Sequence, residues 1–185
     1  MAPSIRFSVF IATSLDGFIA RPDGAIDWLN DANRRVPAGE DCGYQSFFDS
    51  VDTLVMGRHT FELVLSFDDW PYGDKPVVVL SSRPIAVPAA LRASVTWSDE
   101  APAALVARLS AAGAQRLYVD GGVTIQRFLA AGLIEDLTMT LIPVLLGEGR
   151  RLFGPLAGDV PLRLAGSRVF DFGFVQLNYR VLRGA

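Results

Sequence analysis

Three short polar segments in this sequence have residue types suited to binding phosphate or ribose. They are Gly57-Arg58-His59-Thr60, Ser81-Ser82-Arg83 and Gly121-Gly122-Val123-Thr124, and each follows a short apolar run typical of a buried strand. Glycine lets a backbone approach a ligand closely, hydroxyls donate hydrogen bonds, and arginine donates charge-assisted ones. Parallel strands end at one edge of a sheet, where open α/β proteins bind their ligands. Together the segments predict a dinucleotide site.

The kind of dinucleotide follows from what these segments contain and lack. The Rossmann pattern G-x-G-x-x-G is absent, which argues against a standard Rossmann dehydrogenase. Arg58 and Arg83 stand where an acidic ribose ligand would otherwise lie, and arginine there favours the 2′-phosphate of NADPH over NADH. Each segment alone is more often an ordinary turn or capped loop. The prediction of NADPH therefore depends on their joint occurrence.

Apolar runs predict the elements that position these segments. We expect helices where apolar residues recur at helical spacing, at residues 44–51, 101–112 and 124–131. A long loop is expected from residue 17 to about residue 43, interrupted by Ile26 and Trp28-Leu29, and loops of that length are usually functional. Strands are expected at residues 7–12, 53–56, 77–80, 94–97, 116–119, 136–143, 162–170 and 174–182.

The order of these elements predicts the fold class. Strands and helices alternate first, and strands follow one another without helices at the end of the chain, which indicates a mixed α/β sheet with helices on its faces. The chain has 185 residues, half of them apolar, which is enough for one core and too little for two ordinary domains. We expect a single domain over residues 1–185.

Charge and composition exclude several classes of function. The net charge is −3 and no Lys/Arg run is present, so neither nucleic acid nor an anionic membrane is expected as a partner. A small molecule is expected instead. Lys75, Cys42 and His59 are each the only residue of their type, which excludes a disulfide or a clustered zinc site and leaves redox chemistry to an organic cofactor. The apolar N-terminal run is too short and too polar for a membrane span and lacks a cleavage site, so a cytoplasmic location is expected.

Five ordered motifs resemble the dihydrofolate-reductase superfamily, and most of all its branch related to the reductase domain of bacterial riboflavin biosynthesis. The resemblance runs from about Phe7 to Tyr179. It implies an eight-stranded, mostly parallel sheet with an antiparallel C-terminal hairpin, and NADPH along its edge. The motifs are Ala12-Thr13-Ser14-Leu15-Asp16-Gly17-Phe18-Ile19-Ala20, Val55-Met56-Gly57-Arg58-His59-Thr60-Phe61-Glu62, Val79-Leu80-Ser81-Ser82-Arg83-Pro84, Val119-Asp120-Gly121-Gly122 and Leu141-Ile142-Pro143-Val144-Leu145-Leu146-Gly147-Glu148-Gly149.

The resemblance also implies roles for individual residues in holding NADPH. Arg58, His59 and Thr60, which follow Gly57, are expected at the pyrophosphate and 2′-phosphate. Ser81, Ser82 and Arg83 are expected at the adenosine end. Gly121, Gly122, Val123, Thr124 and Ile125 are expected around the pyrophosphate, with a cis peptide between the two glycines. Ala12, Ile19 and Ala20, beside the turn at Gly17, are expected at the nicotinamide.

The substrate side has fewer candidates. Dihydrofolate reductases place a general acid in their first helix, and an ungapped count from Gly57 brings Asp41 to that position, although Asp41 between Gly39 and Gly43 is somewhat better explained as a helix cap. Asp27 and Trp28 are either a lid or a packed loop anchor, and Tyr44 and Phe48 are either pocket wall or core.

Three functions follow from these expectations. The first is an NADPH-dependent reductase of a pyrimidine- or pteridine-like heterocycle, of the 5-amino-6-(5-phosphoribosylamino)uracil reductase type. The alternatives are a true dihydrofolate reductase with Asp41 as its acid and a non-catalytic NADP-binding protein. The resemblance also implies a possible homodimer.

Overall fold

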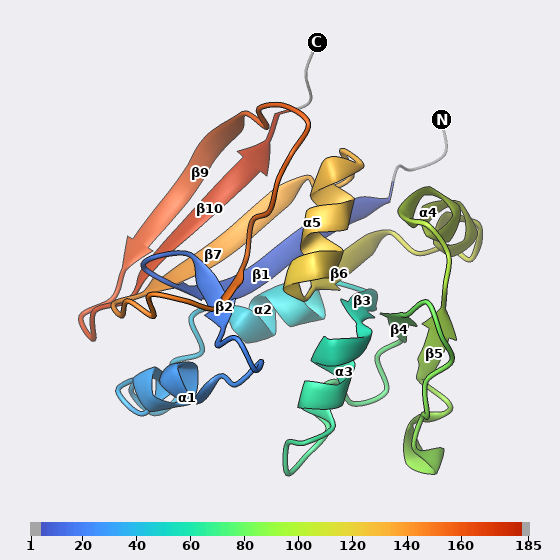
Figure 1. Ribbon diagram of the computed structural model, residues 1–185, viewed down its shortest axis with the longest axis horizontal. Helices are drawn as coiled ribbons and strands as arrows, with labels where there is room; N and C mark the ends of the chain where they lie inside the picture. Colours follow the sequence, from blue (N-terminus) through green and yellow to red (C-terminus); the bar gives the residue numbers. More distant parts are fainter. Residues whose placement is uncertain (1–4, 183–185) are drawn as a thin grey trace.

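The computed structural model describes residues 5–182, so the ends of the expected domain, residues 1–4 and 183–185, lie outside the described residues. An eight-stranded sheet runs through the molecule in the order β5-β4-β3-β6-β1-β7-β10-β9 (Figure 1). Its strands are β1 Arg6–Ser14, β3 Thr53–Gly57, β4 Val77–Leu80, β5 Val95–Ser98, β6 Arg116–Asp120, β7 Asp136–Ile142, β9 Leu162–Val169 and β10 Val175–Val181. Within the described range, no helix is long and apolar enough to cross a membrane.

Pairing in this sheet is parallel from β5 to β7 and antiparallel where β10 joins β7 and β9. This confirms the predicted mostly parallel sheet with an antiparallel C-terminal hairpin. A second sheet is formed by β2, Phe18–Ala20, and β8, Arg150–Arg151. It joins the first loop of the chain to the loop that follows β7.

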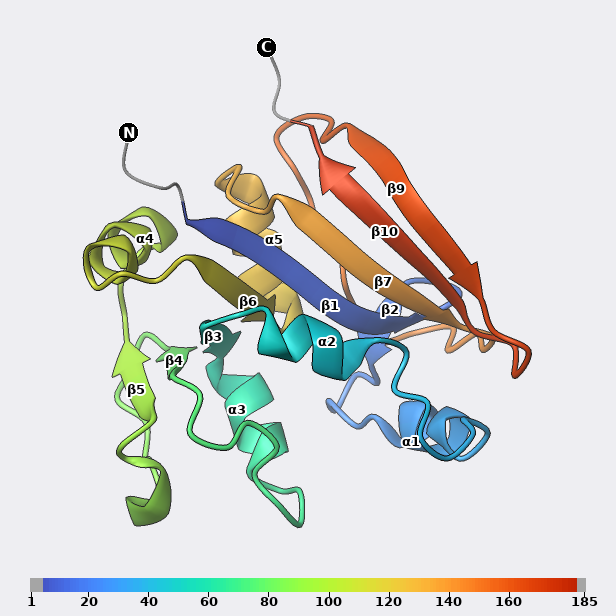
Figure 2. The same ribbon diagram turned by 180° about the vertical axis from the view of Figure 1, so that it is seen from behind.

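Helices cover both faces of the sheet. The buried side chains of α4 (Pro102–Ala111) and α5 (Gly122–Ala130) pack on one face. Those of α2 (Tyr44–Asp49) and α3 (Arg58–Val64) pack on the other. Accordingly, α5 lies in front of the strands in Figure 1 and α2 lies in front of them in the reverse view of Figure 2. A short 3-10 helix, η1, spans Ala89–Leu91.

Strand β4 shows why the central strands are apolar without interruption. Val77 and Val79 belong to the core cluster under α2 and α3, whereas Val78 belongs to the cluster under α4 and α5. All three side chains are at most 3% exposed. A strand that is buried on both faces needs apolar residues at successive positions, as in other parallel sheets.

Two helices were absent from the sequence-based expectations. The chain between residues 17 and 43 contains β2 and the helix α1, Asp27–Asn33, where we expected loop. Trp28 of α1 is 5% exposed and packs with Ile142, Phe170 and Phe174, and this packing supports a helix too short for a clear periodic pattern. The second missed helix is α3, which begins directly at Arg58.

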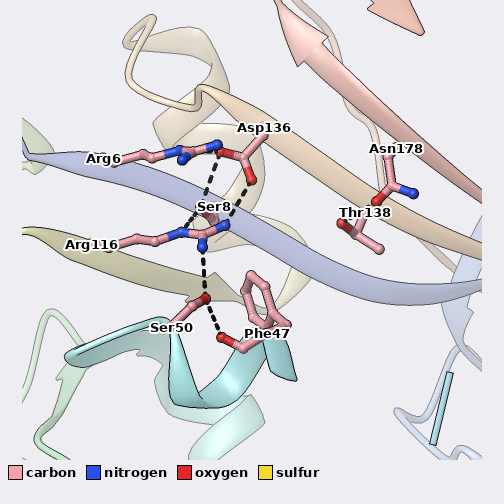
Figure 3. A network of polar contacts seen from close by, with 8 residues as sticks. All are labelled: Arg6, Ser8, Phe47, Ser50, Arg116, Asp136, Thr138 and Asn178. Carbon is pink, nitrogen blue, oxygen red and sulfur yellow. Dashed lines mark hydrogen bonds and ion pairs between the residues drawn. The ribbon is translucent and has the colours of Figure 1, made fainter. Parts of the chain in front are cut away.

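A polar clasp joins three strands at their amino ends, on the edge opposite the polar segments (Figure 3). Asp136 of β7 accepts hydrogen bonds from Arg6 Nε at 2.8 Å and from Arg116 Nη2 at 3.3 Å. Arg116 also donates to Ser8 Oγ and, through Nη1, to Ser50 Oγ next to α2. The clasp therefore connects β1, β6 and β7 and fixes the end of α2.

Candidate active site

A cavity of about 900 Å³, here called the main cavity, lies at the carboxyl ends of β1 and β6. One wall is the loop from Ile19 through α1, a second is α3 with the segment after it, and a third is the turn into α5. Its lining residues are Phe10, Ile11, Ala12, Ile19, Ala20, Asp23, Gly24, Ala25, Ile26, Leu29, His59, Thr60, Glu62, Leu63, Val64, Phe67, Tyr72, Tyr118, Asp120, Gly121, Gly122, Val123, Gln126, Arg150 and Arg151.

Two glycines form a tight turn between β6 and α5 at the floor of this cavity. Gly121 has φ of +88°, and a Cβ there would collide with Thr60 Oγ1. A Cβ on Gly122 would lie 2.8 Å from Ile19 Cδ1 and 3.2 Å from the carbonyl oxygen of Arg151. Side chains are therefore excluded here by the close approach of α3, β2 and β8, and the turn leaves backbone exposed to the cavity.

The peptide bond between Gly121 and Gly122 is trans, so the expected cis bond is wrong. The positive φ of Gly121 makes the change of direction from strand to helix, and glycine adopts that conformation without a steric penalty.

The structure brings half of the sixteen expected cofactor residues together. Thr124 and Ile125 are instead buried within α5, and Gly17 forms the turn between β1 and β2. Gly57 packs closely on α5, since a Cβ there would lie 3.0 Å from Thr124 Oγ1. The eight that line the main cavity are Ala12, Ile19, Ala20, His59, Thr60, Gly121, Gly122 and Val123.

Arg58 lies beside the cavity, and Glu62 holds its guanidinium. Its Nη1 donates to Glu62 Oε1 at 2.7 Å, and its Nη2 lies 3.3 Å from His59 Nε2. The His59 side chain is 66% exposed. The guanidinium lowers the pKa of Glu62, so this carboxylate stays ionised at neutral pH.

The expected adenosine segment lies outside the main cavity, at the end of β4. Ser81 Oγ accepts a hydrogen bond from the Arg83 backbone N–H at 3.3 Å, while Ser82 and Arg83 are exposed. The indole Nε1 of Trp97 donates to the Ser81 carbonyl oxygen at 3.0 Å. Trp97, 38% exposed, therefore forms a fixed aromatic wall beside these polar groups.

Two arginines line the cavity that the sequence-based reasoning did not single out. Arg150 and Arg151 form β8 and pair with Ala20 and Phe18 of β2. Arg150 Nε donates to the Pro22 carbonyl oxygen at 3.3 Å, and the Arg151 guanidinium lies 4.5 Å from the centre of the Phe18 ring. The adjacent arginines after Gly149 were the available signal for this cationic rim.

Asp16 attaches the loop that carries β8 to the turn after β1. Its Oδ2 accepts from the Gly147 backbone N–H at 2.8 Å, and its Oδ1 accepts from the Leu146 backbone N–H and from Ser14 Oγ at 2.6 Å. These bonds, led by the one from Ser14, lower the pKa of Asp16 to about 2. Asp16 is a structural anchor for the cationic rim.

Asp120 is the titratable group at the floor of the main cavity, and it too was missed as a site residue. It ends β6, and its Oδ1 accepts a 2.8 Å hydrogen bond from the Gly121 backbone N–H. Burial raises its pKa from 3.8 to about 6, against the opposing effect of that hydrogen bond. The available signal was an acidic residue between a buried strand and a glycine pair.

A second cavity of about 600 Å³, here called the side cavity, adjoins the main cavity and shares Phe10, Ala12 and Leu29 with it. The other lining residues come from the segment around α1, the start of α2, strand β7 and the turn before β10. They are Asn33, Val36, Pro37, Ala38, Gly39, Glu40, Asp41, Cys42, Tyr44, Thr140, Ile142 and Phe174.

Asp41 lines the side cavity and caps α2. Its Oδ1 accepts from the Gly43 backbone N–H and its Oδ2 from the Gln45 backbone N–H, both at 2.8 Å. The two hydrogen bonds lower the pKa of this exposed carboxyl. A general acid at neutral pH needs a raised pKa, so the geometry favours the helix cap over the acid.

The remaining substrate candidates occupy different environments. Tyr44 lines the side cavity, and burial raises the pKa of its hydroxyl. Phe48 stacks between Tyr44 and Tyr72 rather than lining either cavity. Asp27 forms a 2.6 Å ion pair with Arg21, and buried Trp28 anchors α1. Of the two alternatives for these residues, the structure favours a packed anchor over a lid.

Comparison with known proteins identifies the family to which this chain belongs. The RibD C-terminal domain family matches residues 7–176, and the chain belongs to that family. Its fold is like that of dihydrofolate reductase.

Individual relatives cover nearly the whole chain. The chain is 37% identical over 174 residues to the uncharacterized protein YwjB of Bacillus subtilis (strain 168), covering 92% of this chain and 95% of YwjB. A putative riboflavin biosynthesis protein from Shewanella sp. PV-4 is 42% identical with a TM-score of 0.90, covering 97% of this chain and 100% of that protein.

Two more distant structures share the fold. One is a diaminohydroxyphosphoribosylaminopyrimidine deaminase/5-amino-6-(5-phosphoribosylamino)uracil reductase from Thermotoga maritima, at TM-score 0.72 and 14% identity over 97% of this chain and 57% of that chain. The other is dihydrofolate reductase from Enterococcus faecalis complexed with NADP(H), at TM-score 0.62 and 18% identity over 95% and 96%.

Proposed function

We propose that this protein is an NADPH-dependent reductase that transfers a hydride to a C=N or C=O bond of a small pyrimidine- or pteridine-like heterocycle. The observation that carries the proposal is the Gly121-Gly122 turn, which presents backbone to a cavity of about 900 Å³ at the carboxyl edge of a parallel sheet. Membership of the RibD C-terminal domain family supports the reaction class.

The residues around the turn fit the phosphates of NADPH. The first backbone N–H groups of the nine-residue helix α5 and the closely packed glycines provide donors without side chains in the way. Arg150 and Arg151 bring guanidinium groups to the same cavity, and His59 adds an imidazole. When bound, NADPH supplies the hydride.

Preference for NADPH over NADH depends on residues at the ends of β3 and β4. We assign the 2′-phosphate to Arg58 and Arg83 and the adenosine to Ser81 and Ser82, with Trp97 beside them. Arginine matches a phosphate with planar, charge-assisted hydrogen bonds. The exposed serine and arginine at the end of β4 support this assignment.

The reacting end of the cofactor is assigned to Ala12, Ile19 and Ala20, near the place where the two cavities meet. Ala12 lines both cavities, so a nicotinamide against it would face a substrate in either one. Small side chains at Ala12 and Ala20 leave room for a planar ring. Proximity and orientation are the main contributions of such a site to catalysis.

Reduction of a C=N or C=O bond consumes one hydride and one proton, and Asp120 is our candidate for the proton donor. With a pKa of about 6, a substantial fraction of this carboxyl is protonated in mildly acidic solution. It lies at the floor of the main cavity next to the glycine turn. Asp41, whose pKa is lowered, is less suited to that role.

A substrate screen tests the proposal. Loss of NADPH absorbance is followed with dihydrofolate, dihydropterins and 5-amino-6-(5-phosphoribosylamino)uracil with its dephosphorylated form. We expect turnover of at least one heterocycle, and Asp120→Asn should reduce it by about 100-fold or more, the usual effect of losing a general acid. Asp41→Asn should retain most activity. Turnover that depends on Asp41 and not on Asp120 would favour a true dihydrofolate reductase.

A second result would indicate a protein that binds the cofactor without catalysing a reaction. NADPH binding without turnover of any heterocycle in the screen would favour a non-catalytic NADP-binding protein. Absence of NADPH binding in a folded preparation would contradict the proposal itself.

A further inference from the structure

The cations that line the two cavities are few. Of the described residues that line either cavity, Arg150 and Arg151 are the permanently cationic ones, and both line the main cavity. The main cavity also contains Asp23, Glu62 and Asp120. The main cavity therefore has few positive groups compared with the phosphate groups of NADPH.

The position of these cations associates them with the cofactor. The Arg151 carbonyl oxygen would lie 3.2 Å from a Cβ on Gly122, so β8 is packed against the glycine turn. Arg150 precedes it on the same strand, opposite Ala20. His59 precedes Thr60, whose hydroxyl contacts the position of a Gly121 Cβ. Both arginines and His59 thus come from segments that meet the proposed pyrophosphate site.

Two walls of the main cavity are formed largely by apolar side chains. Leu63, Val64 and Phe67 come from α3 and the segment after it, and Ile26 and Leu29 come from the loop before α1 and from α1 itself. Such walls bind a flat heterocycle by apolar contact and offer no charged partner to a phosphate.

The side cavity is acidic. Its titratable lining residues include Glu40 and Asp41, and the hydrogen bonds to Asp41 keep that carboxyl ionised. Arg168 is already engaged there, since its Nη2 donates to Glu40 Oε2 at 2.7 Å. A negative group that entered this cavity would meet carboxylates rather than a free guanidinium.

We infer, on the basis of the proposed function, that the substrate is a neutral heterocycle of the pyrimidine or pteridine class that carries no phosphate ester. A phosphate monoester has a charge of about −1.5 to −2 at pH 7 and loses hydration on entering an apolar or acidic pocket. This separates the chain from the phosphoribosyl compound in the name of the Thermotoga reductase, which shares the fold at 14% identity.

A matched pair of ligands tests this inference by binding as well as by turnover. The protein is first saturated with NADP⁺, which cannot donate a hydride, and the affinity of each ligand is then measured by titration calorimetry. The pair is 5-amino-6-(5-phosphoribosylamino)uracil and its dephosphorylated form, and a neutral dihydropterin is the third ligand. We expect the dephosphorylated compound to bind at least about tenfold more tightly than its phosphate ester, a difference of about 1.4 kcal/mol.

A charge installed on the apolar wall gives an independent readout. Phe67 is 42% exposed, so Phe67→Arg adds a cation at the rim of the main cavity without filling the core. It should shift the ratio of the two affinities by about tenfold or more in favour of the phosphorylated compound. Val169→Arg, at a 75% exposed position of β9, is the matched control and should change neither affinity.

The results of these experiments separate the inference about the substrate from the proposed function. Equal or tighter binding of the phosphorylated compound by the unchanged protein would overturn the inference, and so would failure of both neutral ligands to bind when NADP⁺ is bound. Failure of NADP⁺ itself to bind would instead contradict the proposed function.

Discussion

Asp120 and Gly121 are joined by a 2.8 Å hydrogen bond from the Gly121 backbone N–H to the carboxylate of its neighbour. This hydrogen bond orients the carboxyl at the point where β6 turns into α5. The residue proposed as proton donor is thus held by the same turn that is proposed to bind the cofactor phosphates.

The pH dependence of turnover should report the protonation of Asp120. Its pKa of about 6 means that the acidic form predominates below pH 6 and decreases about tenfold for each pH unit above it. We expect kcat/KM to be flat below pH 6 and to fall above it. The measurement is a pH profile at saturating NADPH. Asp120→Asn should give a low activity without this break, and an unchanged break in the variant would assign it to another group.

The same raised pKa predicts that Asp120 destabilises the fold at neutral pH. The unfolded carboxyl ionises near its ordinary value of 3.8 and the folded one near 6, so stability is lost as pH rises between those values. A shift of about two units corresponds to about 3 kcal/mol. Asp120→Asn should therefore raise the unfolding free energy at pH 8 and change it little at pH 4, measured by urea denaturation. A loss of stability at pH 8 would contradict this account.

Asp16 should control how firmly the cationic rim is held. Asp16→Ala removes the acceptor for Leu146 and Gly147 and frees the loop that carries β8. We expect the KM for NADPH to rise severalfold and the amides of residues 146–151 to exchange hydrogen faster. The pKa of Asp16 is about 2, so its contribution is lost only as pH falls through about 2 and the effect should be the same from pH 5 to 9.

Much of the fold followed from the sequence because burial dictates residue type there. Val77, Val78 and Val79 need apolar side chains on both faces, and such runs identified every strand of the main sheet within a residue or two. The missed helix α3 begins with Arg58, where the polar residues were interpreted as a binding motif rather than as a first helical turn.

Part of the candidate site was also predictable from the sequence. Thr60 and Gly121 were singled out because they belong to recognisable glycine-containing segments after strands, whereas Ile19 was named only through the family resemblance. Asp120 was missed, since its role depends on a pKa that burial sets, and burial of a strand's last residue cannot be read from residue type. Arg150 and Arg151 reach the cavity only because β8 pairs with β2 across more than 120 residues of chain, a long-range contact.

The polar clasp should contribute to stability without affecting the site. Asp136 has a side chain only 13% exposed and binds both Arg6 and Arg116. Asp136→Asn leaves two partly buried guanidinium groups without their ionic partner and should cost about 2 kcal/mol, measured by urea denaturation. Asp159→Asn, at an exposed loop position, is the control and should cost little. A change in the KM for NADPH would contradict the separation of clasp and site.

Binding of NADPH, measured by titration calorimetry on the unchanged protein and on two glycine variants, tests the central claim most directly. Gly121→Ala places a Cβ against Thr60 Oγ1 at a φ of +88°, whereas Gly158→Ala meets no atom within 4 Å. Circular dichroism and thermal unfolding confirm that each variant is folded. We expect one NADPH site per chain that is retained in Gly158→Ala and weakened by at least about tenfold in Gly121→Ala. Absence of NADPH binding by the folded, unchanged protein, or equal affinity in folded Gly121→Ala, would contradict it.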